Sequence, residues 1–103
     1  MSEEAKVSWP ENAFWNMDYH LAGMIAEGVN QFLLAQRNGV PSRFSELGPE
    51  EAETAWETDL IDIRDGFRLI QKKSNGETLS SYEEADIRQA LQLFAKSFQD
   101  LWD

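Results

Sequence analysis

Large apolar residues recur with helical spacing through the last part of the chain, and this pattern constrains the fold more than any other. They stand four or three positions apart, at Ile87, Leu91, Phe94, Phe98 and Leu101. Because an α-helix has about 3.6 residues per turn, this spacing places all five side chains on one stripe. We therefore expect a helix over residues 81–102 that packs against the core up to its last turn.

The same spacing predicts a second helix over residues 49–73. Gly48-Pro49 marks its start and Asn75-Gly76 its end. Its apolar stripe consists of Trp56, Leu60, Ile63, Phe67 and Ile70. Gly66 lies beside this stripe, where glycine costs about 1 kcal/mol relative to alanine. Either a large side chain from another helix crosses there or the helix bends, and close packing is the favoured explanation.

A third helix is predicted near the N-terminus, over about residues 11–37. A short N-terminal arm (residues 1–8) precedes it, Ser8 to Glu11 has capping-box spacing, and Asn38-Gly39 is typical of a helix end. Its apolar residues cover an arc of about 200° on a helical wheel. Such a wide arc suits the central helix of a bundle, which contacts two neighbours.

These elements predict one all-α domain over residues 1–103, an up-down-up three-helix bundle with a short N-terminal arm. The first two helices are joined by a loop at residues 40–48. The last helix is predicted to start at Ser80-Ser81, where Glu83 and Glu84 offer two capping boxes in adjacent registers. The apolar content, 42% of residues, is sufficient for a core.

Charge and composition exclude several classes of function. The chain has no cysteine, so thiolate chemistry is excluded, and no apolar run reaches the roughly 20 residues of a membrane span. The N-terminal residues are polar and acidic, unlike a signal peptide, so we expect a cytoplasmic protein. The net charge of −10 opposes direct binding to nucleic acid and permits binding to a basic protein surface.

Asp18 is the single residue that most invites a functional interpretation. Its position on the wheel, between Val29 and Phe32, predicts a carboxylate within the apolar arc, where it needs a partner. The structural interpretation pairs it with Arg64 or Arg88, or with backbone N–H groups of a first helical turn. The functional interpretation makes it a ligand-binding or catalytic acid.

His20 and Glu27 share the polar face of the same helix, but one histidine with one carboxylate is a poor metal site. We expect His20 to be an exposed surface residue. We predict no catalytic residues, no metal ligands and no cofactor, since neither a nucleophile–base pair nor a glycine-rich phosphate loop occurs.

An acidic block supplies the candidate partner-binding residues. Between positions 46 and 63 no lysine or arginine interrupts it, and the full set is Glu46, Glu50, Glu51, Glu53, Glu57, Asp59, Asp62 and Asp65. One interpretation is a solvated helix face. A second is a magnesium site like that of all-α nucleotide pyrophosphohydrolases, for which Glu50-x-x-Glu53 supplies half of the pattern. The third is a protein-binding surface that imitates a phosphate backbone, because arginine and lysine sites accept carboxylate and phosphate alike.

Three leucines, Leu34, Leu69 and Leu93, fall on otherwise polar sides of their helices. Isolated exposed leucines are ordinary in proteins. Together they would form an apolar patch for a partner or a second copy, so a homodimer is kept open.

Across residues 15–102 the chain resembles a family of small helical proteins of unassigned function encoded by tailed bacteriophages and prophages. The resemblance rests on Trp15-x-x-Asp18-Tyr19-x-Leu21-Ala22-x-x-Ile25, Phe32, Pro41, Trp56-x-x-x-Leu60-x-x-Ile63-x-x-x-Phe67, and Leu91-x-Leu93-Phe94-x-x-x-Phe98-x-x-Leu101-Trp102. The chain departs from the pattern at Gly66, where alanine is usual. The resemblance implies phage or prophage origin, action inside an infected bacterium and no known enzymatic residues.

The function we expect is therefore that of a non-enzymatic phage-type accessory protein that binds a basic host protein, such as a nucleic-acid-handling or defence protein that it inhibits. The alternatives are a structural or replication-associated phage component that assembles with its own copies and, last, a metal-dependent pyrophosphohydrolase.

Overall fold

A computed structural model describes residues 16–35 and 39–101 of the chain. Three α-helices make up most of these residues: α1 (Met17–Leu34), α2 (Pro49–Ser74) and α3 (Ser81–Ser97). Two short 3-10 turns, η3 (Ser42–Phe44) and η4 (Phe98–Asp100), precede α2 and follow α3. No strand occurs in these two ranges, so the predicted all-α three-helix bundle is confirmed.

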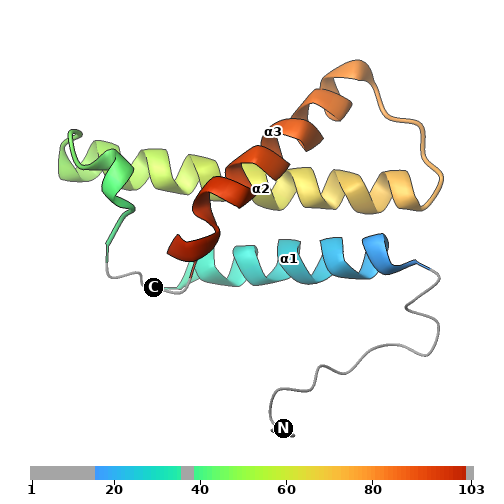
Figure 1. The fold of residues 1–103 in the computed structure, drawn as a ribbon, viewed down its shortest axis with the longest axis horizontal. Coiled ribbons are helices and arrows are strands. Elements are labelled where there is room, and N and C mark those ends of the chain that lie inside the picture. Colours follow the sequence, from blue (N-terminus) through green and yellow to red (C-terminus); the bar gives the residue numbers. More distant parts are fainter. Residues whose placement is uncertain (1–15, 36–38, 102–103) are drawn as a thin grey trace, which may run out of the picture.

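The helix at the centre is α2, not α1 as the wide apolar arc of the first helix led us to expect. Figure 1 shows α1 and α2 lying side by side and antiparallel, with α3 crossing α2 obliquely. Both α1 and α3 pack on α2, whereas the backbones of α1 and α3 do not approach each other closely within the described residues. Part of the apolar arc of α1 therefore has no helix against it.

The hydrophobic core lies mainly between α1 and α2. Its buried members are Ala22, Ala26, Val29, Trp56, Leu60, Ile63 and Phe67. The α1 residues are small, which lets the two helices lie close, and the α2 residues are the large ones predicted from its stripe. Edge-to-face contacts of Trp56 with Phe32 and of Phe67 with Phe94 extend the core towards the ends of α1 and α3.

The C-terminal stripe is the prediction that fares worst. The last α-helix ends at Ser97 rather than near residue 102, and the chain continues into η4. Of the five stripe residues only Ile87 is buried, while Leu91 is 46% and Phe98 is 62% exposed. The buried face of α3 is displaced towards the small residues Ala90 and Ser97. Spacing identified the helix correctly but misjudged which side of it faces α2.

Gly66 explains this displacement. A Cβ atom at position 66 would collide with the Cβ of Ala90 and would lie 3.3 Å from the carbonyl oxygen of Asp86. The predicted close packing is thus confirmed, but the partner is a small side chain and the α3 backbone, not a large side chain. The helix continues without interruption from Pro49 to Ser74.

The helix ends were predicted with mixed success. Gly48-Pro49 begins α2, Asn75 caps its end and Gly76 takes the positive φ of 89°, all as expected. The first of the two offered capping boxes is used: the Ser80 hydroxyl accepts from the Glu83 N–H at 3.1 Å, and the Ser80 N–H donates to the Glu83 carboxylate at 2.9 Å. By contrast, α1 ends at Leu34, earlier than predicted, with an extended Ala35 as its cap. The predicted cap at Ser8–Glu11, the predicted start of the first helix near residue 11 and Asn38 lie outside the described residues.

Among the helices of the described residues, none combines the length and apolar character needed to cross a membrane.

Candidate functional site

The acidic block does not form one continuous face. Successive carboxylates point to different sides of α2, because the sequence spacing within the block does not follow the helical repeat. The structure divides the eight predicted residues into an N-terminal cluster, a mid-helix cluster, two carboxylates near α1 and one that is tied to an arginine.

The N-terminal cluster consists of Glu46, Glu50 and Glu51, all exposed. Glu50 and Glu51 occupy the first turn of α2, where the positive end of the helix dipole stabilises their charge. They line a wide, shallow depression of about 550 Å³ together with Leu47, Thr54 and Ala55. This cluster presents negative charge beside a small apolar floor.

The mid-helix cluster joins Asp62 and Asp65 of α2 with Asp86 of α3. With Gly66, Leu69 and Gln89 they line a small hollow of about 150 Å³ at the crossing of the two helices. Partial burial raises the pKa of Asp62 above its usual value, and the neighbouring carboxylates of Asp59, Asp65 and Asp86 raise it further. The hollow is therefore a site of uncompensated negative charge.

Cations near the mid-helix cluster neutralise only one of its members. Asp65 accepts from the Arg64 Nε at 2.9 Å and lies 3.9 Å from an Arg68 nitrogen. In the part of the chain that the structure describes, neither Asp62 nor Asp86 has an ion pair. These two aspartates are the members of the cluster that a positively charged group from outside would meet.

Asp59 has a structural partner. Arg43, in η3, donates to the Asp59 carboxylate at 3.0 Å, to the Asp100 carboxylate at 3.3 Å and to the buried Ser97 hydroxyl at 2.9 Å. Its guanidinium carbon also lies 4.7 Å from the ring centroid of Phe44 and 5.4 Å from that of Trp56. Asp59 therefore helps to join the loop before α2 to the end of α3, and we remove it from the candidate binding surface.

Glu53 and Glu57 are half-buried and lie on the side of α2 that faces α1. Helical periodicity puts them on the same side as Arg64, which donates to the Asn30 side chain of α1 at 3.0 Å. They flank the α1–α2 contact and do not extend either exposed cluster.

The magnesium-site interpretation needs carboxylates from two helices around Glu50 and Glu53, and these are not brought there. Glu83 caps α3, and Glu84 pairs with Lys73 at 2.9 Å, near the other end of α2. Position 73 is about 35 Å from position 50 along a helix that rises 1.5 Å per residue. Among residues 16–35 and 39–101, no group of three or more histidines, aspartates or glutamates is arranged to hold a metal ion.

The prediction that Asp18 is buried and paired with Arg64 or Arg88 is wrong. Asp18 is exposed in the first turn of α1 and accepts a 2.6 Å hydrogen bond from the Ser74 hydroxyl of α2. This bond, with the backbone N–H groups of Asp18 and Tyr19, lowers the pKa of the carboxyl group. The first-turn alternative therefore holds, because α1 begins only at Met17 and its first backbone N–H groups need an acceptor.

The other singled-out residues are dispersed. His20 is half-buried rather than exposed, with its ring edge-to-face on Tyr19 at 5.4 Å, and Glu27 is exposed. Of the three leucines, Leu34 is 77% exposed, Leu69 lines the mid-helix hollow and Leu93 packs against the core. They do not offer three equivalent exposed positions.

Sequence reasoning missed two residues of these sites. Arg43 stands alone in a predicted loop, and nothing in its neighbours indicates that three segments converge on it. Asp86 follows the predicted capping residues Glu83 and Glu84, and acidic residues are common near the start of a helix. One signal would have placed Asp86 opposite Asp62. Asp86 lies four residues before Ala90 and so shares its side of α3, and Ala90 packs on Gly66, which lies four residues after Asp62.

No family model matches the sequence, and no curated protein or solved structure matches it either.

Proposed function

We propose that the protein is a non-enzymatic accessory protein, of the kind that phages and prophages encode, which acts by binding a basic protein surface. The observation that carries the proposal is the mid-helix hollow, where Asp62 and Asp86 face each other across the α2–α3 crossing without a cation. The proposed partner is a host protein that handles nucleic acid or defends against it. An inhibitor could occupy its basic site because arginine and lysine bind carboxylates and phosphates alike.

This arrangement of carboxylates is costly in the free protein. Partial burial raises the pKa of Asp62, and repulsion among the like charges that share the small hollow raises it further. An arginine or lysine inserted between Asp62 and Asp86 would convert this repulsion into attraction. The N-terminal cluster begins about 18 Å further along the same helix, at 1.5 Å per residue, so one broad basic surface can contact both.

An arginine-rich peptide is a suitable first probe, with binding followed by amide chemical shifts in the ¹⁵N-labelled full chain. We expect the largest shifts around Asp62, Asp65 and Asp86, and we expect affinity to fall as salt rises, because opposite charges are screened over about 8–10 Å. The test variant is Asp62→Asn with Asp86→Asn. The matched control is Glu27→Gln with Glu77→Gln, two exposed carboxylates outside the hollow, which changes net charge equally.

A loss of affinity in the test variant that clearly exceeds the loss in the control supports a specific site in the hollow. Equal losses would reduce the interaction to net charge and overturn the proposal. If the hollow binds the peptide as expected, the test variant should also lose a specific partner captured from bacterial lysate, and the control variant should retain it. Nucleic acid should compete with this protein for that partner.

A self-assembling phage component is the second candidate, favoured by the exposed apolar side chains of Leu21, Met24 and Phe98. Sedimentation velocity of the full chain over a wide concentration range tests it: a monomer at all concentrations rejects this candidate.

A further inference from the structure

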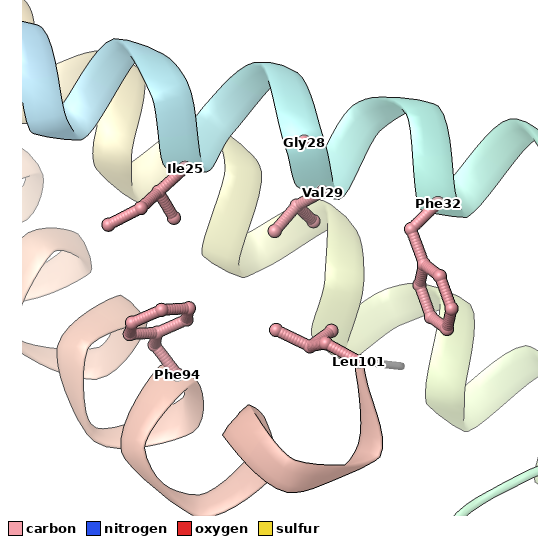
Figure 2. A pocket seen from close by; sticks show the side chains of 6 residues that line it. All are labelled: Ile25, Gly28, Val29, Phe32, Phe94 and Leu101. Atoms are coloured by element: carbon pink, nitrogen blue, oxygen red, sulfur yellow. The ribbon is translucent and has the colours of Figure 1, made fainter. Parts of the chain in front are cut away.

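An apolar groove lies between α1 and the end of α3, on the side of α1 that α2 leaves uncovered. Figure 2 shows Ile25, Val29 and Phe32 of α1 facing Phe94 and Leu101 across an open space, with Gly28 above it. These six residues line an open cavity of about 250 Å³. A cavity of about 150 Å³ lined by similar residues is enough to hold benzene, so this one has room for a large aromatic side chain.

The groove continues beyond the cavity towards the start of α1. Leu21 and Met24, 41% and 48% exposed, lie on the same stripe of α1 as Ile25, Gly28 and Phe32. On the opposite wall Leu91 and Phe98 flank Phe94 on α3 and are 46% and 62% exposed. Several large apolar side chains thus share one open face, which marks a binding site far better than singly exposed residues do.

We propose that the chain's own N-terminal segment, residues 1–15, occupies this groove, with Trp9 in or beside the cavity. The segment joins the described chain at Asn16, directly before the end of α1 towards which the groove extends. It supplies the chemistry that the groove accepts, because it carries Val7, Trp9, Phe14 and Trp15 within nine residues. An indole ring offers a large, rigid apolar surface for such a cavity.

The length of the segment fits this placement. Ile25 lies nine residues into the chain from Asn16, about 14 Å along a helix rising 1.5 Å per residue. Trp9 precedes Asn16 by seven residues, which span up to about 23–25 Å when extended. The chain can therefore reverse direction before α1 and still bring Trp9 over Ile25. A covalently attached occupant also binds without the entropy cost of bringing two molecules together.

A nitroxide spin label can test the proposal without disturbing the groove. The chain has no cysteine, so Ser8→Cys provides a unique attachment site next to Trp9. The readout is the methyl spectrum of the full chain, with Leu21, Ile25 and Leu101 as groove reporters. Leu47 and Ile61 serve as references, since neither lines the groove. We expect selective loss of the groove signals when the label is oxidised and their return when it is reduced.

Three further variants make the result specific. Leu21→Lys places a charge in the groove at a position that is already 41% exposed, so the fold tolerates it, and it should restore the methyl signals of the two remaining groove reporters, Ile25 and Leu101. Leu34→Lys is the matched control on the same helix, at a position 77% exposed and outside the groove, and should leave the loss unchanged. Trp9→Ala in the labelled chain should also restore the groove signals.

The occupant is identified by mixing. Spin-labelled protein without isotope is combined with isotope-labelled protein without spin label, at the same total concentration. The proposal is supported if the groove signals are lost when one chain carries both the spin label and the isotope, but are retained in the mixture. Equal loss in the mixture would assign the groove to a second copy of the chain, and uniform or absent loss would show that residues 1–15 do not bind there; either result overturns it.

Discussion

The two helix contacts made by α2 differ in the size of the α2 side chains at their centres. Against α1 it presents Trp56, Leu60, Ile63 and Phe67, large side chains that fill the space above the small Ala22 and Ala26. Against α3 it presents Gly66 next to the edge-to-face contact of Phe67 with Phe94, and the two backbones approach until Ala90 is in direct contact. The first contact is a core in the ordinary sense, whereas the second is a close crossing of two helices.

This difference determines what lies around each contact. A core filled by large side chains excludes water and leaves little room for charge. A close crossing buries less apolar area and lets polar groups collect at its edges. Arg43 with Asp59, Asp100 and Ser97 joins α2 to the end of α3, and Asp62 with Asp86 lines the hollow at the crossing. The candidate binding site is therefore a consequence of the small residues at the crossing.

The largest expected effect separates the two contacts directly. Trp56→Ala should lower the free energy of unfolding by about 3–5 kcal/mol, as other large core truncations do, because Trp56 is only 1% exposed. Phe98→Ala, on the open wall of the groove, should cost under about 1.5 kcal/mol, since the ring is 62% exposed. Urea denaturation measures both, and similar losses would show that the α1–α2 contact is not the dominant core.

The second prediction tests the close crossing. Gly66→Ala should destabilise the protein by about 1–3 kcal/mol, the usual cost of overpacking, because its methyl group would displace Ala90. Gly28→Ala is the control in another helix, where no atom lies within 4 Å of the added Cβ, and should gain up to about 1 kcal/mol from helix propensity. Thermal melting distinguishes them. If Gly66→Ala stabilises the chain as Gly28→Ala does, the helices are not in the described contact.

The third prediction concerns the arginine that fastens the polar edge of the crossing. Arg43→Lys should cost about 1–2 kcal/mol, since an ammonium group cannot reach both carboxylates and the buried Ser97 hydroxyl. The control Arg68→Lys affects a half-exposed pair at 3.9 Å and should change stability by less than about 0.5 kcal/mol. Chemical denaturation of both variants provides the measurement, and equal small effects would argue that Arg43 is only a surface residue.

The smallest expected effect has the opposite sign. Asp62→Asn should raise the free energy of unfolding by about 0.5 kcal/mol at neutral pH, the scale of partly exposed charge interactions, because it removes repulsion in the hollow. A carboxyl group whose pKa is raised in the folded state binds more protons there than in the unfolded state, so its ionisation lowers stability as pH rises. The gain should therefore disappear as pH falls through the raised pKa towards the usual value of 3.8.

Melting curves of native and Asp62→Asn protein between pH 3 and pH 7, roughly the range in which carboxyl groups titrate, check this sign. Glu27→Gln, which also removes one carboxylate but outside the hollow, is the charge-matched control. A destabilised Asp62→Asn protein at neutral pH would mean that Asp62 makes a favourable contact in the folded state, and the hollow would lose its role as an uncompensated site.

The sequence by itself determined the three α-helices of residues 16–35 and 39–101, the ends of α2 and the start of α3. These depend on interactions over a few residues: the stripe of α2, proline after Gly48, the positive φ at Gly76 and the Ser80–Glu83 capping box. It also identified the large residues of the core, since Trp56, Leu60, Ile63 and Phe67 lie on the predicted stripe and are all buried.

Only the tertiary structure decided which helix is central and which side of α3 is buried. Helical spacing shows that residues share a stripe but not whether a neighbour covers it, and at Gly66 the close backbone approach turned α3 onto Ala90 and Ser97 and left Leu91 and Phe98 open. The same holds for charge. The acidic block is continuous along the chain, but Asp59 is held by Arg43 and Asp62 is set against Asp86 because residues distant in sequence meet there. These long-range contacts depend on how the helices cross, and the local spacing of residues does not specify the crossing.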